Sequence, residues 1–356
     1  MGQSPSSKNY SKNSNDTILI QGNADLIRGK IVPRIYTSEI TKLSYPGDII
    51  LTVRAPVGDL AINEFDSCIG RGVCSIKGNK FIYYYLESLK DKHVWERLSQ
   101  GSTFESINSN DIKNLNLKIP SNSTQNHIIN FLTAIDTKIE LLQKKHSEYL
   151  RFKQYLMQNI FADKSAEKLR FANFTEEWKT VKIKDIFDER SEKGFSDLEL
   201  LSVTLNDGVI KRSEIESKDN SNENKSNYKH VLPDDIVYNS MRMWQGASGV
   251  SSYEGIVSPA YTILIPKNAY SKFFGYYFKT NEMIHQFKKY SQGLTSDTWN
   301  LKYPLISEIK IKIPSIDEQK EITNVFETID LKTKILQNNL EEVMTIKKGL
   351  LQQMFV

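Results

Sequence analysis

The chain has 356 residues, of which 39% are hydrophobic and 25% charged, and its formal net charge is +4. This length suits one large domain or two to three ordinary ones, and the mild positive charge permits a nucleic-acid partner without requiring one. The two cysteines exclude a disulfide scaffold and a four-cysteine zinc site, and they suit a reducing cytoplasm. No apolar run reaches the length of a membrane span, and the first residues lack the pattern of a signal peptide.

Residues 1–118 have the pattern of a mixed α/β unit. Apolar runs at residues 17–21, 48–53 and 72–76 predict strands, and an aromatic-rich run at residues 80–98 predicts a helix. A polar stretch at residues 4–16 predicts a solvated loop.

The next segment has the period of a long helix that begins shortly after Pro120. Apolar side chains recur alternately four and three residues apart, which is the heptad spacing of a helix that packs along its length against another helix. The predicted helix has about 38 residues, or about 57 Å at 1.5 Å per residue. Its apolar seam positions are Ile128, Leu132, Ile135, Ile139, Leu142, Tyr149 and Leu156.

Residues from about 170 to 312 repeat the pattern of the first unit. Strands are predicted at residues 199–204, 235–239, 261–265 and 308–313, and a helix at residues 270–290. Residues 217–229 are polar and predict a loop. The remainder of the chain is a second long heptad helix, with seam positions Ile322, Phe326, Ile329, Leu336, Leu340, Val343 and Leu350.

The two halves are copies of each other. Ile119-Pro120 matches Ile313-Pro314, and Ile135-Asp136-x-Lys138 matches Ile329-Asp330-x-Lys332, at a constant offset of 194 residues. Weaker matches lie upstream, where Arg54-x-x-x-Gly58 resembles Arg242-x-x-x-Gly246. Because the two helices carry apolar seams of the same phase, we expect them to pair with each other, which fits helices of this length better than packing on a globular body.

Polar residues interrupt the two seams at matching positions. Lys153 and Lys347 occupy equivalent places. Buried polar seam residues fix register and partner choice in some helix pairs. The alternative, which we favour, is that the lysine stems lie along the seam edge with their ammonium groups in solvent.

Side chains that can read DNA are concentrated in the loops of both variable units. Arg can contact guanine with two hydrogen bonds, Asn and Gln can do the same with adenine, and Lys, Ser and Thr suit phosphates. Arg54 and Arg242 are the strongest candidates, because each follows a strand at the same place in both copies; the alternative is an ion pair with Asp48 or Asp235. The candidates are Gln21, Asn23, Arg28, Arg34, Arg54, Arg71, Gln100, Ser102 and Thr103 in the first unit, and Asn206, Lys211, Arg212, Asn239, Arg242, Trp244, Gln245, Gln292, Thr295 and Ser296 in the second.

No motif in the chain predicts a catalytic centre or a resident cofactor. The five histidines lack metal-ligand spacing, and Ile31 follows Gly29-Lys30 where a phosphate-binding loop needs Ser or Thr. A metal-dependent nuclease site would need Asp297 with Glu308 and Lys310. The first copy has Asn114-Leu115-Asn116 at the position of the last two, which argues against that site.

This arrangement resembles the specificity (S) subunit of Type I restriction–modification systems. The resemblance rests on two variable units, each followed by a long helix with the motif Gln-x-x-Ile-x-x-Phe/Val-Leu/Phe-x-x-Ile-Asp, which runs from Gln125 to Asp136 and from Gln319 to Asp330. The stretch Gly2-Gln3-Ser4-Pro5-Ser6 and the run from Pro46 to Arg54 also look like the target-recognition domains of that family.

The resemblance implies an α/β (α+β) fold with two target-recognition domains separated by two long helices that pair as an antiparallel coiled coil. We place the domains at residues 1–120 and 166–314 and the spacer helices at residues 121–165 and 315–356. Each domain would read one half of a bipartite target in double-stranded DNA. The helix pair would set the spacing and dock two modification (adenine methyltransferase) subunits, which restriction subunits would join. S-adenosylmethionine, ATP and Mg²⁺ would belong to those partners, the chain itself would be non-catalytic and cytoplasmic, and no membrane would be involved.

One departure from the family pattern concerns the first unit. The second unit opens with Trp178-x-x-Val181-Lys182-Ile183-x-x-Ile186-Phe187, and the first shows no counterpart, since Met1-Gly2 aligns roughly with residues 191–194. We therefore expect the first unit to lack a strand and a helix, which leaves two alternatives: a start further upstream or a shortened form.

Two other functions, from other classes of protein, stay open at this point. One is a structural or interaction protein built on a helical hairpin, and the other is the nuclease. The duplicated variable units favour the specificity subunit, since a spacer has no need of such domains.

Overall fold

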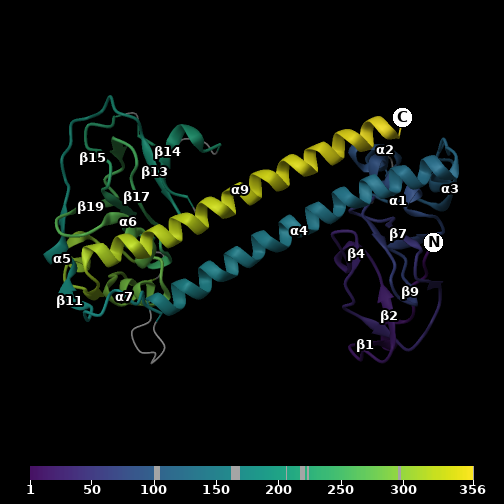
Figure 1. Ribbon diagram of the computed structural model, residues 1–356, viewed down its shortest axis with the longest axis horizontal. Helices are drawn as coiled ribbons and strands as arrows, with labels where there is room; N and C mark the ends of the chain where they lie inside the picture. Colours follow the sequence, from purple (N-terminus) through teal and green to yellow (C-terminus); the bar gives the residue numbers. More distant parts are fainter. Residues whose placement is uncertain are drawn as a thin grey trace. The chain divides into compact units, whose positions relative to one another are not determined.

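The computed structural model describes residues 1–99, 105–161, 169–205, 207–216, 221–222, 224–295 and 298–355. It divides into two compact units: unit 1 comprises Met1–Lys145 and Leu336–Val356, and unit 2 comprises His146–Ile335. Each unit therefore combines one α/β domain with the segments of both long helices that pack on it (Figure 1). The described residues contain no helix long and apolar enough to cross a membrane.

Unit 1 is built on two five-stranded sheets, ordered β1-β5-β2-β9-β6 and β10-β7-β8-β4-β3. Their strands are short because turns interrupt the chain every few residues. The strands are β1 (Tyr10–Ser11), β2 (Thr17–Ile20), β3 (Leu26–Ile27), β4 (Lys30–Ile31), β5 (Tyr36–Thr37), β6 (Leu43–Ser44), β7 (Ile49–Thr52), β8 (Leu60–Ile62), β9 (Ser67–Ile69) and β10 (Val73–Ile76). The helices are α1 (Lys80–Asp91), α2 (Val94–Ser99), α3 (Ser109–Lys113) and α4 (Asn122–Ile160), with 3-10 turns η1 (Ser7–Asn9) and η2 (Asn23–Asp25).

Unit 2 repeats the central strands of unit 1 and adds one at the edge. Its main sheet is ordered β12-β19-β16-β17, so that β19, β16 and β17 correspond to β10, β7 and β8. The strands are β11 (Lys179–Lys182), β12 (Phe187–Glu189), β13 (Leu201–Thr204), β14 (Gly208–Lys211), β15 (Lys229–Val231), β16 (Ile236–Asn239), β17 (Ser248–Val250), β18 (Gly255–Val257), β19 (Tyr261–Pro266) and β20 (Lys310–Ile313). The helices are α5 (Ile183–Ile186), α6 (Ser271–Tyr277), α7 (Asn281–Tyr290), α8 (Tyr303–Ile306) and α9 (Ile316–Met354), with 3-10 turns η3 (Arg212–Glu214) and η4 (Met243–Gln245).

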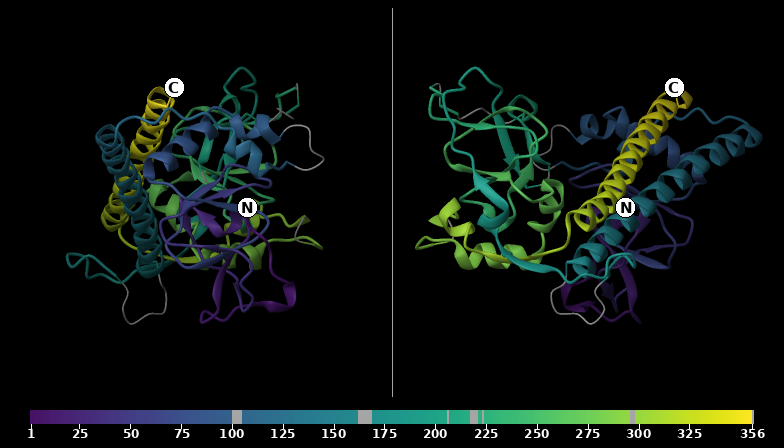
Figure 2. Two further views of the ribbon diagram at one scale, coloured as in Figure 1. Left: turned by 90° about the vertical axis from the view of Figure 1, so that its right-hand side faces the viewer. Right: turned by 60° about the vertical axis from the view of Figure 1, so that its left-hand side comes forward.

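The long helices α4 and α9 have 39 residues each. Both begin after a serine, because the N–H of Thr124 donates to Ser121 Oγ and that of Glu318 to Ser315 Oγ. None of the predicted seam residues is exposed. In unit 2, Leu156 of α4 and Phe326 of α9 belong to one core, and in unit 1 Leu132 of α4 and Leu351 of α9 share another. Figure 2 shows the two helices from two further directions.

The two shorter helices expected from aromatic periodicity are each broken into two. Residues 80–98 form α1 and α2, with His93 between them in a left-handed conformation (φ 54°). Residues 270–290 form α6, which ends at Tyr277, and α7, which Thr280 caps by accepting from the N–H of Met283. The apolar stripe continues through both breaks, which is why periodicity alone did not reveal them.

Candidate DNA-recognition surfaces and the helix locks

Each unit has an arginine turn, which comprises residues 54–58 after β7 and residues 242–246 after β16. The second turn contains the 3-10 helix η4, and the first contains a cis peptide bond between Ala55 and Pro56. In unit 2, Arg242 follows β16, and Gly246 closes the turn in the left-handed conformation (φ 87°). In unit 1, Arg54 follows β7, and Gly58 adopts φ 97° at the equivalent place. A side chain at either glycine would strain the backbone, which explains the repeated Arg-x-x-x-Gly spacing.

A backbone hydrogen bond fixes each turn against the segment that follows the aromatic helices. Ile107 N–H donates to Val53 O at 3.0 Å in unit 1, and Leu301 N–H donates to Ser240 O at 2.8 Å in unit 2. Ile107 and Leu301 are separated by the repeat offset of 194 residues. The turns are therefore positioned by the same scaffold in both units.

Both arginines are exposed and free of the ion pairs considered as alternatives. The Asp235 carboxylate is held instead by Arg190, at 2.7 and 3.2 Å, and both side chains are almost fully buried. Asp48 accepts hydrogen bonds from Ser44, Ser75 and the N–H of Tyr45. These contacts lower the pKa of Asp48 against the opposing effect of burial. Neither aspartate pairs with the arginine proposed for it.

In unit 2 the arginine turn lies beside a second loop. Residues Gln292 and Asn300 form a two-way backbone bridge that closes the loop between them, and Trp299 packs edge-on against Trp244 with ring centroids 5.4 Å apart. Lys288 lies over the Trp244 ring at 5.7 Å. The structure thus brings Arg242, Trp244, Gln245, Gln292 and Thr295 to one end of the sheet. The sequence analysis did not name Lys288 and Trp299, because only their contacts with the Trp244 ring bring them to this surface.

Unit 1 gathers its candidates in a comparable way. The N–H of Val53 donates to Gly72 O, and a side chain at Gly72 would meet Gln21 O at 2.0 Å, so Arg54, Arg71 and Gln21 lie near one another. Arg34 is 3.9 Å from Asp25, whose other carboxylate oxygen accepts from the N–H of Gln21. Asn23, Arg28, Arg34 and Arg71 are exposed.

Some candidates lie elsewhere in unit 2 or outside the described residues. Arg212 donates to Ile215 O and lines a separate hollow together with Asn239 and Tyr261. Lys211 lies over the Tyr253 ring. Gln100, Ser102, Thr103, Asn206 and Ser296 lie outside the described residues, as does Asp297.

The repeated lysines form locks between the two long helices. In unit 1, Lys347 of α9 contacts Asp136 of α4 at 2.7 Å and Glu87 of α1 at 2.8 Å, and Tyr84 Oη donates to Asp136. In unit 2 the roles of the helices are exchanged, because Lys153 of α4 contacts Asp330 of α9 at 2.5 Å.

Tyr276 completes the unit 2 lock by donating to Asp330 at 2.8 Å. Each copy therefore contributes its lysine to the aspartate of the other. The prediction that the ammonium groups of both lysines lie in solvent is wrong. Their acidic partners are on the other long helix and on α1.

The repeated glutamines have an equally local explanation. Gln125 donates to Pro120 O at 2.9 Å and accepts from Asn79, while Gln319 donates to Pro314 O at 3.0 Å and accepts from the N–H of Tyr270. Each buried amide ties the first turn of a long helix to the domain preceding it.

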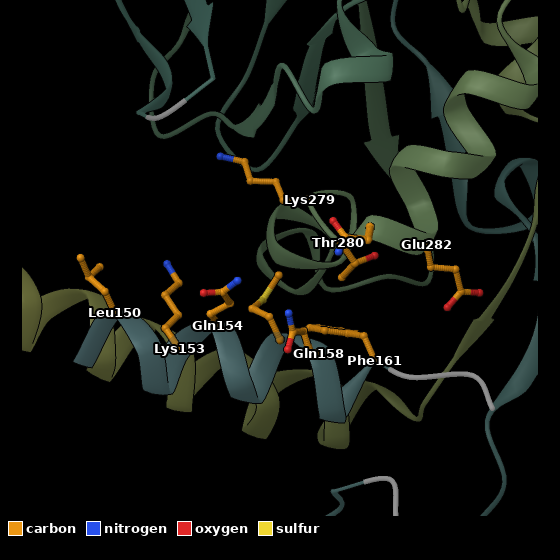
Figure 3. A pocket seen from close by; sticks show the side chains of 10 residues that line it. Leu150, Lys153, Gln154, Gln158, Phe161, Lys279, Thr280 and Glu282 are labelled. Atoms are coloured by element: carbon orange, nitrogen blue, oxygen red, sulfur yellow. The ribbon is translucent and has the colours of Figure 1, made fainter. Parts of the chain in front are cut away.

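A pocket of about 480 Å³ lies in unit 2 where α4 passes the junction of α6 and α7. Figure 3 shows Leu150, Lys153 and Gln154 of α4 on one side and Lys279 and Thr280 on the other. Burial lowers the pKa of Lys279, and the nearby Lys153 lowers it further. Among its described lining residues are two cationic side chains, Lys153 and Lys279, and one carboxylate, that of Glu282.

The nuclease site receives no support from the residues that the structure describes. Glu308 is bound by Lys182 at 2.6 Å and Lys184 at 2.5 Å, and these hydrogen bonds lower its pKa to about 2. Across the described ranges, no group of three His, Cys, Asp or Glu side chains could hold a metal ion.

Comparison with known proteins agrees with this geometry. Residues 2–149 and 175–345 match the family model for the Type I restriction modification DNA specificity domain. A putative Type I restriction enzyme MjaX specificity subunit from Methanocaldococcus jannaschii is 36% identical over 172 residues, which are 46% of this chain and 40% of that protein. The MjaVIII specificity subunit of the same organism is 22% identical over 78% of this chain and 69% of its own length. The match to the first of these relatives thus spans less than half of its length.

Solved structures show the same fold. The Type I restriction–modification S subunit from M. genitalium superposes with a TM-score of 0.62 at 18% identity, covering 100% of this chain and 92% of that one. A chain from a study of complex assembly and conformational transition of the type I R-M system gives 0.56 at 15% identity, with 95% and 90% covered. The family model matches most of the chain, in both of its halves. The chain therefore belongs to the Type I restriction–modification DNA specificity family, whose role in those systems is DNA recognition and not catalysis.

Proposed function

We propose that this chain is the specificity subunit of a Type I restriction–modification complex and reads a bipartite DNA target, one half with each unit. The observation that carries the proposal is the duplicated arginine turn. It presents Arg54 one residue after the bonded Val53 and Arg242 two residues after the bonded Ser240, and both arginines are exposed and outside the ion pairs that would make them structural. Two similar readers in one chain suit two separate half-sites.

The side chains around the turn of unit 2 are of the kinds that contact DNA. Arg242 and Gln245 can each make two hydrogen bonds to a base edge, whereas Lys288 suits a phosphate. The net charge of +4 supplies little non-specific attraction, so tight binding requires basic surface from partner subunits. This predicts weak DNA binding by the isolated chain and stronger binding in the complex.

Methylation in cells tests the reading of the second half-site. With the cognate modification subunit, Arg242→Ala is expected to change or relax one half of the methylated motif and leave the other half intact. Arg242→Lys is the matched control, because lysine replaces a phosphate contact but not a two-bond guanine contact. Loss of specificity in both variants supports base reading, and an unchanged motif in both contradicts it.

We also propose that exposed apolar residues on the long helices dock two modification subunits. Leu141 and Phe152 of α4 and their equivalents Ile335 and Ile346 of α9, at the offset of 194 residues, are 48–63% exposed. If the seam residues are taken as heptad positions a and d, these four residues occupy positions c and g, which are neighbours on one side of a helix. Unit 1 carries Leu141 and Ile346, and unit 2 carries Phe152 and Ile335.

Large exposed side chains repeated in both copies predict two equivalent protein contacts. Phe152→Asp with Ile346→Asp is expected to abolish copurification of the modification subunit without unfolding the chain, since neither side chain is in a core. The matched control replaces Lys138 and Lys332 with Asp. Normal copurification of the first double variant would contradict the docking assignment.

A further inference from the structure

One acidic side chain of the unit 1 lock has no acidic counterpart in unit 2. Tyr84 and Tyr276 occupy equivalent places, because each donates a hydrogen bond of 2.8 Å to the aspartate of its lock. Three residues later the chain has Glu87 in unit 1 and Lys279 in unit 2. Where unit 1 places a carboxylate beside the lysine of the lock, unit 2 therefore places a second ammonium group.

The hydroxyl groups of the next residues support this correspondence. Ser88 Oγ donates to Tyr85 O at 2.7 Å, and Thr280 Oγ1 donates to Tyr277 O at 2.8 Å. Beyond this turn the two units differ, because α1 continues to Asp91 whereas α6 ends at Tyr277. The pocket of about 480 Å³ in unit 2 opens where α6 ends, and it therefore lies beside the position at which the charge is reversed.

Positive charge is concentrated at one end of this pocket. Figure 3 shows Lys153 and Lys279 toward that end and Glu282 toward the opposite end. Lys153 is paired with Asp330 at 2.5 Å. Within the described residues, the ammonium group of Lys279 donates to Leu205 O at 3.3 Å and forms no ion pair. Two ammonium groups therefore share one paired carboxylate at this end.

The protonation equilibria of the two units reflect this difference in charge. Burial lowers the pKa of Lys279, Lys153 lowers it further, and the opposing effects of two aspartates are smaller. In unit 1 burial also lowers the pKa of Lys347, but Glu87 and Asp136 outweigh that effect and raise it. An added carboxylate would therefore favour the charged form of Lys279, as the carboxylates of unit 1 do for Lys347.

We propose that this pocket binds a small organic carboxylate with an apolar body. The carboxylate would lie beside Lys153, as the Glu87 carboxylate lies beside Lys347 in unit 1, and would also contact Lys279. The apolar body would lie against the apolar lining of the pocket, whose volume suits a ligand of this size. That lining consists of Leu150, Met157 and Phe161. None of these residues is a candidate for DNA contact, so the ligand site is separate from the reading of DNA.

Calorimetric titration of the full chain with phenylpropionate and with hexanoate tests the proposal. We expect both to bind, and the uncharged phenylpropionamide not to bind. Phenylpropionate at about ten times its Kd should raise the unfolding midpoint of unit 2 by about 3–6 °C. Lys279→Met should weaken binding about tenfold or more. Lys272→Met is the matched control on α6, since Lys272 is 45% exposed and does not line the pocket, and it should leave binding unchanged.

Lys279→Glu separates loss of binding from loss of folding. A carboxylate at this position would face Lys153 as Glu87 faces Lys347. The free variant should therefore be at least as stable as the wild type in thermal unfolding, while phenylpropionate no longer raises its midpoint. Binding to Lys279→Met or Lys279→Glu as tight as to the wild type would overturn the location of the site.

The nature of the ligand is tested in the same titrations. The proposal is overturned if neither carboxylate binds at about millimolar concentration, or if inorganic phosphate binds as tightly as phenylpropionate. Asp163 and Glu167 lie outside the described residues and could supply a carboxylate from the chain itself. The variant that combines Asp163→Asn and Glu167→Gln should bind phenylpropionate like the wild type. Binding in this variant alone would assign the pocket to the chain's own carboxylates and overturn a separate ligand.

Discussion

Replacing Lys347 by Met should destabilise unit 1 strongly, and more so at higher pH. The Lys347 side chain is 12% exposed and neutralises two carboxylates, Asp136 and Glu87. Methionine preserves the length of the stem and the packing along the helix seam. The substitution therefore removes the charge while creating little empty volume.

The magnitude follows from the burial of the partners. Removing one member of a buried ion pair costs about 3–5 kcal/mol, because the other charge is left uncompensated. Glu87 and Asp136 retain side-chain exposures of 28% and 33%, which places the expected loss at the lower end, about 3 kcal/mol. At about 2–4 °C per kcal/mol for a domain of this size, the unfolding midpoint of unit 1 should fall by about 6–12 °C.

The pH dependence has a definite sign. Burial raises the pKa of Glu87 above its ordinary value of 4.5, and Lys347 opposes that rise. Without Lys347 the pKa of Glu87 rises further, so the folded state binds more protons than the unfolded state over a wider range above pH 4.5. Stability then falls as pH increases through that range, and the deficit of the variant should be larger at pH 8 than at pH 5.

Thermal unfolding of the wild-type chain and the variant at both pH values measures this effect. Lys348→Met is the matched control, since Lys348 is 57% exposed and lies 3.9 Å from Asp91. It should shift the midpoint by less than about 2 °C. The ion-pair role of Lys347 would be refuted if Lys347→Met lowered the unfolding midpoint no more than the control does. It would also be refuted if the loss of stability were larger at pH 5 than at pH 8.

Four other substitutions test the remaining structural assignments. Lys153→Met should lower the free energy of unfolding of unit 2 by about 1 kcal/mol, because its partner Asp330 is more exposed than the partners in unit 1. An equal loss for Lys153→Met and Lys347→Met in calorimetry would contradict the claim that burial of the partners sets the size of the effect. Arg190→Met should lower the free energy of unfolding by about 3–5 kcal/mol, because Asp235 is left buried without an ion-pair partner. Arg242→Met should leave the thermal unfolding midpoint unchanged. Equal midpoints for the two variants would contradict these roles. Gln319→Leu should lower the free energy of unfolding by about 1–3 kcal/mol, because Pro314 O and the Tyr270 N–H lose their hydrogen-bond partner. A variant as stable as the wild type would contradict this role of Gln319.

The sequence predicted the elements whose evidence is local. Heptad spacing identified both long helices, and the weaker upstream repeat identified the corresponding strands β7 and β16. These features depend on residues close together in the chain, so period and alternation suffice to find them.

Contacts between distant segments could not be predicted in the same way. The partner of Asp235 is Arg190, 45 residues away, and an arginine nearer in sequence was an equally reasonable choice. The acids that bind Lys347 lie on α1 and α4, more than 200 residues earlier. Thr280 breaks a helix that its flanking aromatics favour, because its side chain caps α7. Which loop residues contact bases depends in addition on DNA shape, which no pattern in the chain encodes.

The most direct measurement is the methylated-adenine map of cells that carry this chain with a cognate modification subunit, for the wild type, Arg54→Ala and Arg242→Ala. We expect the wild type to produce one bipartite motif with a fixed gap. Each substitution should alter a different half of the motif while preserving the gap. A single uninterrupted motif, or two substitutions that change the same half, would contradict the assignment of one half-site to each unit.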